Sequence, residues 1–154
     1  PTWLEDLALT DEFFKNNIGM AKQILKREIR HVQDKVKAEV LILEAYKNSK
    51  DKRLLTFDIN CPLGDILKSL PEVLFAVYPR RHDGLWTVTA ISDQGTKTFI
   101  NRKDLPSAWG GLRDEELQKV TGVNDAVFCH QGLYMAVAKS KEGAIKLAQI
   151  AVES

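Results

Sequence analysis

Cysteine, histidine and long apolar runs are scarce in this sequence, and each scarcity argues against a class of protein. The two cysteines, Cys61 and Cys129, lie far apart and outside any CxxC spacing, which argues against a disulfide framework and a structural zinc site. No run of about 18 apolar residues is present, so no membrane span is expected. From the polar start, no signal peptide is expected. We therefore expect a reduced, cytoplasmic protein.

The residues of a self-contained active site are also sparse. The three histidines, His31, His82 and His130, are scattered and form no HxH, HxxxH or His-Asp cluster, so metal binding within this chain is not expected. Cys129 and His130 are adjacent, but neighbouring residues of a strand point to opposite faces, which argues against a nucleophile–base pair. Without paired carboxylates or a triad, a complete enzyme is disfavoured.

The composition suits a globular fold with an uneven charge distribution. The 154 residues are 44% hydrophobic and 28% charged, enough for one domain with a core. Residues 15–53 carry eleven Lys or Arg and five Asp or Glu, so this stretch is +6 (11 − 5) in a chain of net charge +1. Such asymmetry permits contact with nucleic acid or an acidic partner, and a solvated helix face is the simpler alternative.

The N-terminal third predicts one long helix. Thr10 with Asp11 and Glu12 suggests the helix start, and no proline interrupts residues 11–47. At about 1.5 Å per residue the helix would be roughly 55 Å long, more than a domain of this size spans. It therefore breaks near Gly19 or within 30–37, or it packs on an absent domain or a second copy. Apolar residues recur along it at helical steps: Phe14, Ile18, Ala21, Leu25, Ile29, Val32, Val36, Val40 and Leu43.

The rest of the chain predicts short strands and helices. Alternation and turn residues indicate hairpins over 73–92 and 126–138, and Ser140 is expected to cap a final amphipathic helix. The fold class is therefore α+β, with a helical arm at 1–53 and a mainly antiparallel sheet with helices at 54–154. The other expected elements are a strand at 54–59 and helices at 62–70 and 113–121.

Two helix starts could bind an anion. The turn at Gly110 and Gly111 leads into a helix whose first residues are acidic, which favours a structural turn with Trp109 as a core anchor. Ser140 with Lys139 and Lys141 is the better anion site, and an ordinary capped helix is the alternative.

Within 99–144, several residues follow one another in a specific order: Phe99, Arg102, Leu105, Pro106, Trp109, Gly111, Leu112, Arg113, Asp114, Glu115, Leu117, Gly122, Phe128, His130, Lys141, Glu142, Gly143 and Ala144. In these residues the region resembles the closing part of the MYG exonucleases, a family of metal-dependent hydrolases related to the DHH phosphoesterases. The loop after His130 departs from the family pattern, and Gly110 stands where the family usually has Arg. The Val77-Tyr78-Pro79 segment and the Pro1-Thr2-Trp3 start also look like family segments.

The resemblance implies that this chain is the C-terminal, substrate-binding portion of a phosphoesterase or nucleic-acid exonuclease. Hydrolysis would occur in an N-terminal domain that holds manganese or magnesium, so this chain alone is predicted to be inactive. That domain is the expected partner of this chain. The expected ligand is a nucleic acid or a phosphorylated small molecule, and the chain could also form a homodimer. A non-catalytic interaction domain is the alternative function. The predicted substrate-binding residues are Arg102, Arg113, His130, Lys139 and Lys141.

Overall fold

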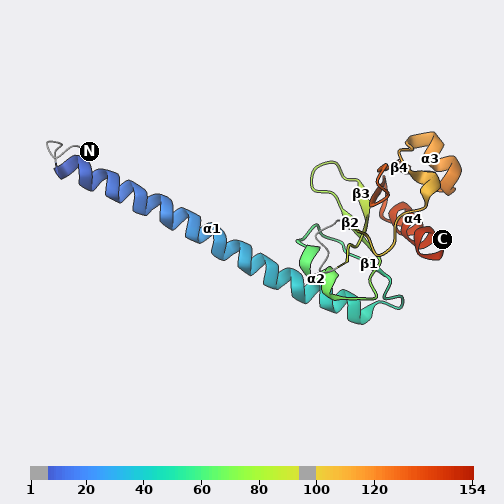
Figure 1. The fold of residues 1–154 in the computed structure, drawn as a ribbon, viewed down its shortest axis with the longest axis horizontal. Coiled ribbons are helices and arrows are strands. Elements are labelled where there is room, and N and C mark those ends of the chain that lie inside the picture. The colour runs from blue at the N-terminus through green and yellow to red at the C-terminus, as the bar shows by residue number, and fades with distance from the viewer. Residues whose placement is uncertain (1–6, 94–99) are drawn as a thin grey trace. The chain divides into compact units, whose positions relative to one another are not determined.

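The computed structural model describes residues 7–93 and 100–154, and Figure 1 labels most of its elements. The helix α1 runs without a break over Leu7–Asn48, so the alternative of a broken helix is wrong. It begins before Thr10, which therefore lies inside the helix rather than at its cap. Among the described residues, no helix is long and apolar enough to cross a membrane. The Pro1-Thr2-Trp3 match and Phe99 lie outside the described residues.

The chain divides into two compact units, Pro1–Lys37 and Ala38–Ser154. The described part of the first unit is helix alone. The second unit starts earlier than the expected boundary at residue 54, because Ala38 and Ile42 of α1 are buried in its core.

The second unit contains a five-stranded sheet, which confirms the α+β class. The strand order is β1-β2-β3-β5-β4, in which β1 and β2 are parallel and every other neighbouring pair is antiparallel. The order places β5 between β3 and β4, both of which precede it in the sequence. The strands are β1 (Leu54–Thr56), β2 (Phe75–Pro79), β3 (Trp86–Ala90), β4 (Ala126–Cys129) and β5 (Met135–Ala138).

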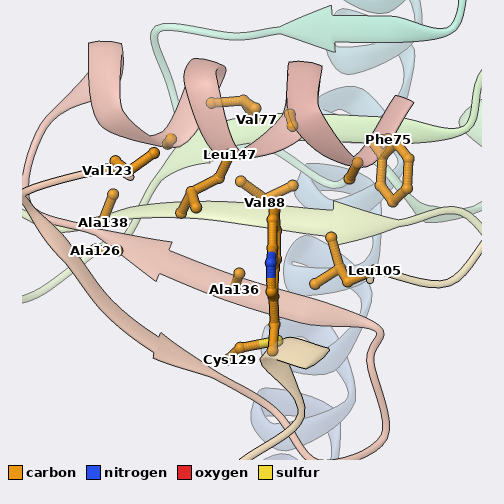
Figure 2. Close-up of a cluster of buried hydrophobic side chains, with 14 of the residues drawn as sticks. Phe75, Val77, Val88, Leu105, Val123, Ala126, Cys129, Ala136, Ala138 and Leu147 are labelled. Atoms are coloured by element: carbon orange, nitrogen blue, oxygen red, sulfur yellow. The ribbon is translucent and has the colours of Figure 1, made fainter. Parts of the chain in front are cut away.

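One face of the sheet packs against α4 (Lys141–Glu153). Side chains such as Phe75, Val88 and Leu147 fill this core, as Figure 2 shows. Trp109 is buried in the same core, in the short 3-10 helix Ser107–Trp109, as the core-anchor interpretation predicted. The helix α3 (Asp114–Thr121) ends as expected at Gly122, whose φ of 69° is left-handed.

The other face is covered near β1 and β2 by a second core. The end of α1 supplies Ala38 and Ile42, and α2 (Gly64–Ser69) supplies Leu67 against Ala76 of β2.

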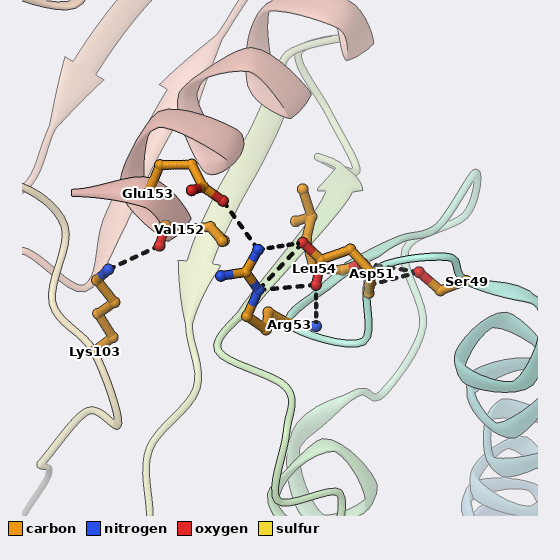
Figure 3. Close-up of polar contacts among 7 residues, drawn as sticks. All are labelled: Ser49, Asp51, Arg53, Leu54, Lys103, Val152 and Glu153. Atoms are coloured by element: carbon orange, nitrogen blue, oxygen red, sulfur yellow. Dashed lines mark hydrogen bonds and ion pairs between the residues drawn. The ribbon is translucent and has the colours of Figure 1, made fainter.

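Polar contacts join the C-terminal end of α4 to two loops, as Figure 3 shows. The guanidinium of Arg53 donates to Asp51 at 2.9 Å and to Glu153 at 2.9 Å. The Arg53 bonds hold the pKa of the Asp51 carboxyl below its ordinary value. Lys103 Nζ donates to the backbone oxygen of Val152 at 2.9 Å, one of the carbonyls that a helix end leaves unbonded.

Candidate functional site

A set of aromatic and cationic side chains gathers at the β4 edge of the sheet. The Arg113 guanidinium carbon lies 4.4 Å from the centroid of the Phe128 ring, a cation–π contact. The Phe128 and His130 rings meet edge to face at 6.2 Å, and the His130 and Tyr134 rings lie 4.3 Å apart. These four residues are named here the Arg113 cluster. Two of the five predicted site residues, Arg113 and His130, therefore come together.

The backbone fixes the cluster in place. Cys129 N donates to Leu112 O at 3.0 Å, which attaches the segment before α3 to β4. In the turn between β4 and β5, Gly132 N donates to His130 Nδ1 at 2.9 Å. Because Nδ1 accepts this bond, the neutral imidazole carries its hydrogen on Nε2. Leu133 adopts a left-handed φ of 57°, an uncommon conformation for a branched side chain.

One cavity adjoins the cluster, and a second cavity adjoins the first. A cavity of about 530 Å³ is lined by Tyr134 and Gly132 together with Ala90, Ser92 and Asn101. A second cavity, of about 330 Å³, shares Ala90 and Ser92 with the first.

Hydrogen-bonding groups line this second cavity between α2 and the sheet. Tyr78 and Thr89 meet there through their hydroxyl oxygens at 3.2 Å. Asn60 and Lys68 also line it. The two cavities therefore offer a ligand polar groups, and the larger of the two adjoins the aromatic cluster through Tyr134.

Arg102 is bound within the protein instead of facing a ligand. Its side chain is 10% exposed, and its guanidinium donates to the backbone oxygens of Lys68, Leu70 and Val73 at 2.5 to 2.9 Å. These oxygens lie at and after the end of α2. The arginine therefore holds the loop before Leu105 against that helix.

The two lysines lie toward the opposite end of the β4–β5 hairpin from the turn that holds His130. Lys139 is exposed and directly follows β5, whose four residues span roughly 13 Å at about 3.3 Å per residue. Lys141 Nζ pairs with Asp58 at 2.5 Å and lies 5.7 Å from the Trp86 ring centroid. A ligand that reaches both ends of the hairpin would have to be extended.

The start of α4 is already occupied by a carboxylate of the chain. Ser140 caps the helix as predicted, its Oγ accepting from Gly143 N at 3.0 Å. Asp125 Oδ2 accepts from Ser140 N at 2.8 Å and also from the Ser140 hydroxyl. The positive helix end is therefore satisfied internally, as in the capped-helix alternative.

Cys129 and His130 do not form a nucleophile–base pair. Cys129 is fully buried, its Sγ lies 3.7 Å from the backbone oxygen of His130, and burial raises the thiol pKa to about 11. Cys61 is also a free thiol. Within 7–93 and 100–154, no three His, Cys, Asp or Glu side chains group as metal ligands.

Sequence reasoning overlooked Phe128 and Tyr134 as site residues. The i, i+2 spacing of Phe128 and His130 could have revealed the first, since strand residues two apart share a face. Nothing in the sequence pointed to Asp125, because its contacts with Ser140 depend on the pairing of β4 with β5.

Comparisons with known proteins identify the family. The model of the MYG1 exonuclease family, described as Uncharacterised protein family (UPF0160), matches residues 1–152. A Schizosaccharomyces pombe MYG1 protein is 34% identical over 75% of this chain and 37% of its own length. The MYG1 exonuclease of Homo sapiens is 31% identical over 53% of this chain and 21% of its own length. The MYG1 exonuclease of Rattus norvegicus is 25% identical over 97% of this chain and 42% of its own length.

This chain thus spans less than half the length of these relatives. No solved structure matches. The family match over nearly every residue establishes that this chain belongs to the MYG1 exonuclease family.

Proposed function

We propose that this chain is the C-terminal, substrate-binding portion of a metal-dependent phosphoesterase or exonuclease that acts on nucleic acid. Relatives named exonuclease support a nuclease-like hydrolase. The described residues do not fit a metal site, so manganese or magnesium is assigned to a separate, DHH phosphoesterase-like domain. That domain is the proposed partner of the unit described here.

The Arg113 cluster is the observation that carries the proposal. Unstacked bases of single strands bind on aromatic rings and on guanidinium planes, and Phe128, His130 and Tyr134 provide rings beside Arg113. The three carboxylates in the first turn of α3, directly after Arg113, disfavour a dense anion at this point. Base stacking by the cluster therefore suits the site better than a phosphate grip.

The phosphates are assigned to the other predicted residues. Exposed Lys139 is proposed to bind a phosphate further along the strand, and Lys141 to join it by leaving Asp58. His130 is proposed to donate from Nε2. Arg102 contributes by holding the loop that carries Asn101, a lining residue of the larger cavity.

The test is the affinity of the 154-residue chain for a labelled single-stranded RNA of about 12 nucleotides, measured by fluorescence anisotropy. Arg113→Ala should weaken binding about tenfold, because a charge-assisted contact and a stacking plane are lost. Lys146→Ala removes one exposed charge on α4 and should leave the affinity within about twofold. Equal losses in both variants, or no binding by the parent chain, would favour the non-catalytic interaction domain.

A second measurement separates binding from hydrolysis. The chain incubated with the same RNA and manganese or magnesium should release no product, because the described residues lack a metal-ligand group. Product that persists after contaminating nuclease has been excluded would place the metal chemistry within this chain and contradict the proposed division of roles.

A further inference from the structure

The apolar positions of α1 repeat with a period of eleven residues. These positions form three successive groups of three. Each position lies 11 residues after the corresponding position of the group before it, as positions 14, 25 and 36 do. An 11-residue period corresponds to about 3.67 residues per turn, close to that of a straight helix, so the positions stay on one face. These positions, named here the α1 stripe, are Phe14, Ile18 and Ala21, then Leu25, Ile29 and Val32, then Val36, Val40 and Leu43.

The α1 stripe is exposed along its length. In the first unit Leu25 is 61% and Val32 is 60% exposed, and the described residues of that unit form no second element that could cover them. Within the second unit, the last turns of α1 bury Ala38 and Ile42, whereas Val40 and Leu43 stay exposed. The stripe is therefore a different face from the one that α1 packs on its own core.

The residues that directly follow the stripe positions form one side of the α1 stripe, and several of them are lysines. Residues that directly follow a stripe position include Lys22, Lys26 and Lys37, and also Lys15, which is paired with Asp11. This lysine side of α1 is basic, and an apolar face edged by one charge selects a partner with the opposite charge at the matching edge.

A second copy of this chain does not supply that complement. An antiparallel copy sets the lysine side against itself. If the second copy is parallel, the two α1 stripes face each other. Each residue that precedes a stripe position in one copy then lies beside the residue that follows the next stripe position in the other copy. This pairing brings Glu28 to Gln33 and Glu39 to Glu44, so it forms no opposite-charge pair and one repulsive pair.

We infer that the α1 stripe docks an amphipathic helix of a different polypeptide segment, with apolar residues at the same 11-residue period and carboxylates along the edge that faces the lysine side. Two such helices pair nearly straight, with a slight right-handed supercoil. The inference concerns α1 and does not depend on the substrate-binding role of the Arg113 cluster.

The probe is a synthetic peptide of about three 11-residue repeats, with Leu and Ile at the stripe positions and Glu at the flanking ones. The 154-residue chain should bind it in calorimetric titration, with weaker affinity at high salt. A matched peptide with Lys at the flanking positions should bind at least about tenfold more weakly. Equal binding of both peptides, or of neither, would overturn the inference.

Two variants of the chain locate the docking face. Ile29→Asp introduces a charge on the stripe and should abolish binding of the Glu peptide. Gln23→Asp introduces the same charge at an exposed residue of α1 that neither belongs to the stripe nor flanks it, and should leave the affinity within about threefold, with circular dichroism confirming equal helicity. Light scattering should find the parent chain monomeric. Self-association that Ile29→Asp removes and Gln23→Asp retains would make a second copy the occupant and overturn the proposal.

Discussion

Arg113 and Phe128 meet across a bridge between two segments, the guanidinium carbon 4.4 Å from the ring centroid. The contact places the arginine next to an aromatic row that continues through His130 to Tyr134. Stacking and charge are thus combined in adjacent residues, and their contributions to binding can be separated by the salt dependence of the affinity.

The first prediction uses that separation. Tyr134→Ala should weaken binding of the single-stranded RNA about tenfold, because stacking is worth about 1–3 kcal/mol per base. The slope of log affinity against log salt should stay unchanged, since no phosphate contact is lost. Lys139→Ala, which removes a proposed phosphate contact, should instead reduce that slope by about 0.7.

Tyr134→Phe is the control, because it keeps the ring and should bind within about twofold of the parent. Anisotropy titrations at about 50 to 200 mM salt measure both quantities. A Tyr134→Ala variant with unchanged affinity would exclude Tyr134 as a stacking platform.

The elements of this fold were predictable from local patterns. The hairpins, the Ser140 cap and the Gly122 helix end each depend on residues close in sequence, and the structure has all of them. The long helix was predictable for the same reason, although Thr10 was wrongly taken as its cap.

Contacts between distant segments were not predictable. The stripe was the strongest periodic signal in α1, yet the face packed on the core is that of Ala38 and Ile42, where a small alanine permits close approach. Likewise, the sequence does not distinguish the buried Arg102 from an exposed arginine. The backbone oxygens that accept hydrogen bonds from Arg102 belong to residues about 30 positions away in the chain.

The second prediction concerns thiol reactivity and alkaline pH. Cys61 is partly exposed and should react first with a thiol reagent, whereas Cys129 should react only as the protein unfolds. Burial raises the pKa of Cys129 from 9.0 to about 11, so the folded state holds the proton more tightly than the unfolded state. Its contribution to stability is therefore complete below pH 9 and decreases between pH 9 and 11.

Denaturant titrations across this pH range test the dependence, with Cys129→Ala compared with the parent. The variant loses core packing but should show a flatter decline in the free energy of unfolding above pH 9. The Cys61→Ser variant should lose the fast-reacting thiol. Rapid labelling of Cys129 in the folded protein would contradict its burial.

The last prediction concerns the close approach of Asp125 to Gly143 at the start of α4. A Cβ atom at Gly143 would lie 2.0 Å from Asp125 Oδ1, and the three nearest heavy atoms all belong to this carboxylate. Because Asp125 also accepts from Ser140 N at 2.8 Å, moving it aside breaks the contact that closes the helix end. Glycine is thus required at 143 only while the carboxylate is present.

Gly143→Ala should therefore lower the free energy of unfolding by about 1–2 kcal/mol in the parent chain, through loss of the helix-end contacts. In an Asp125→Ala background the same change should raise it by up to about 1 kcal/mol, because alanine favours a helix over glycine. Gly64→Ala, a helical site with no atom near the new methyl group, should have the same small effect in both backgrounds. Urea titrations of the four combinations of the Asp125 and Gly143 changes give the coupling energy, and a value near zero would show that the two residues act independently.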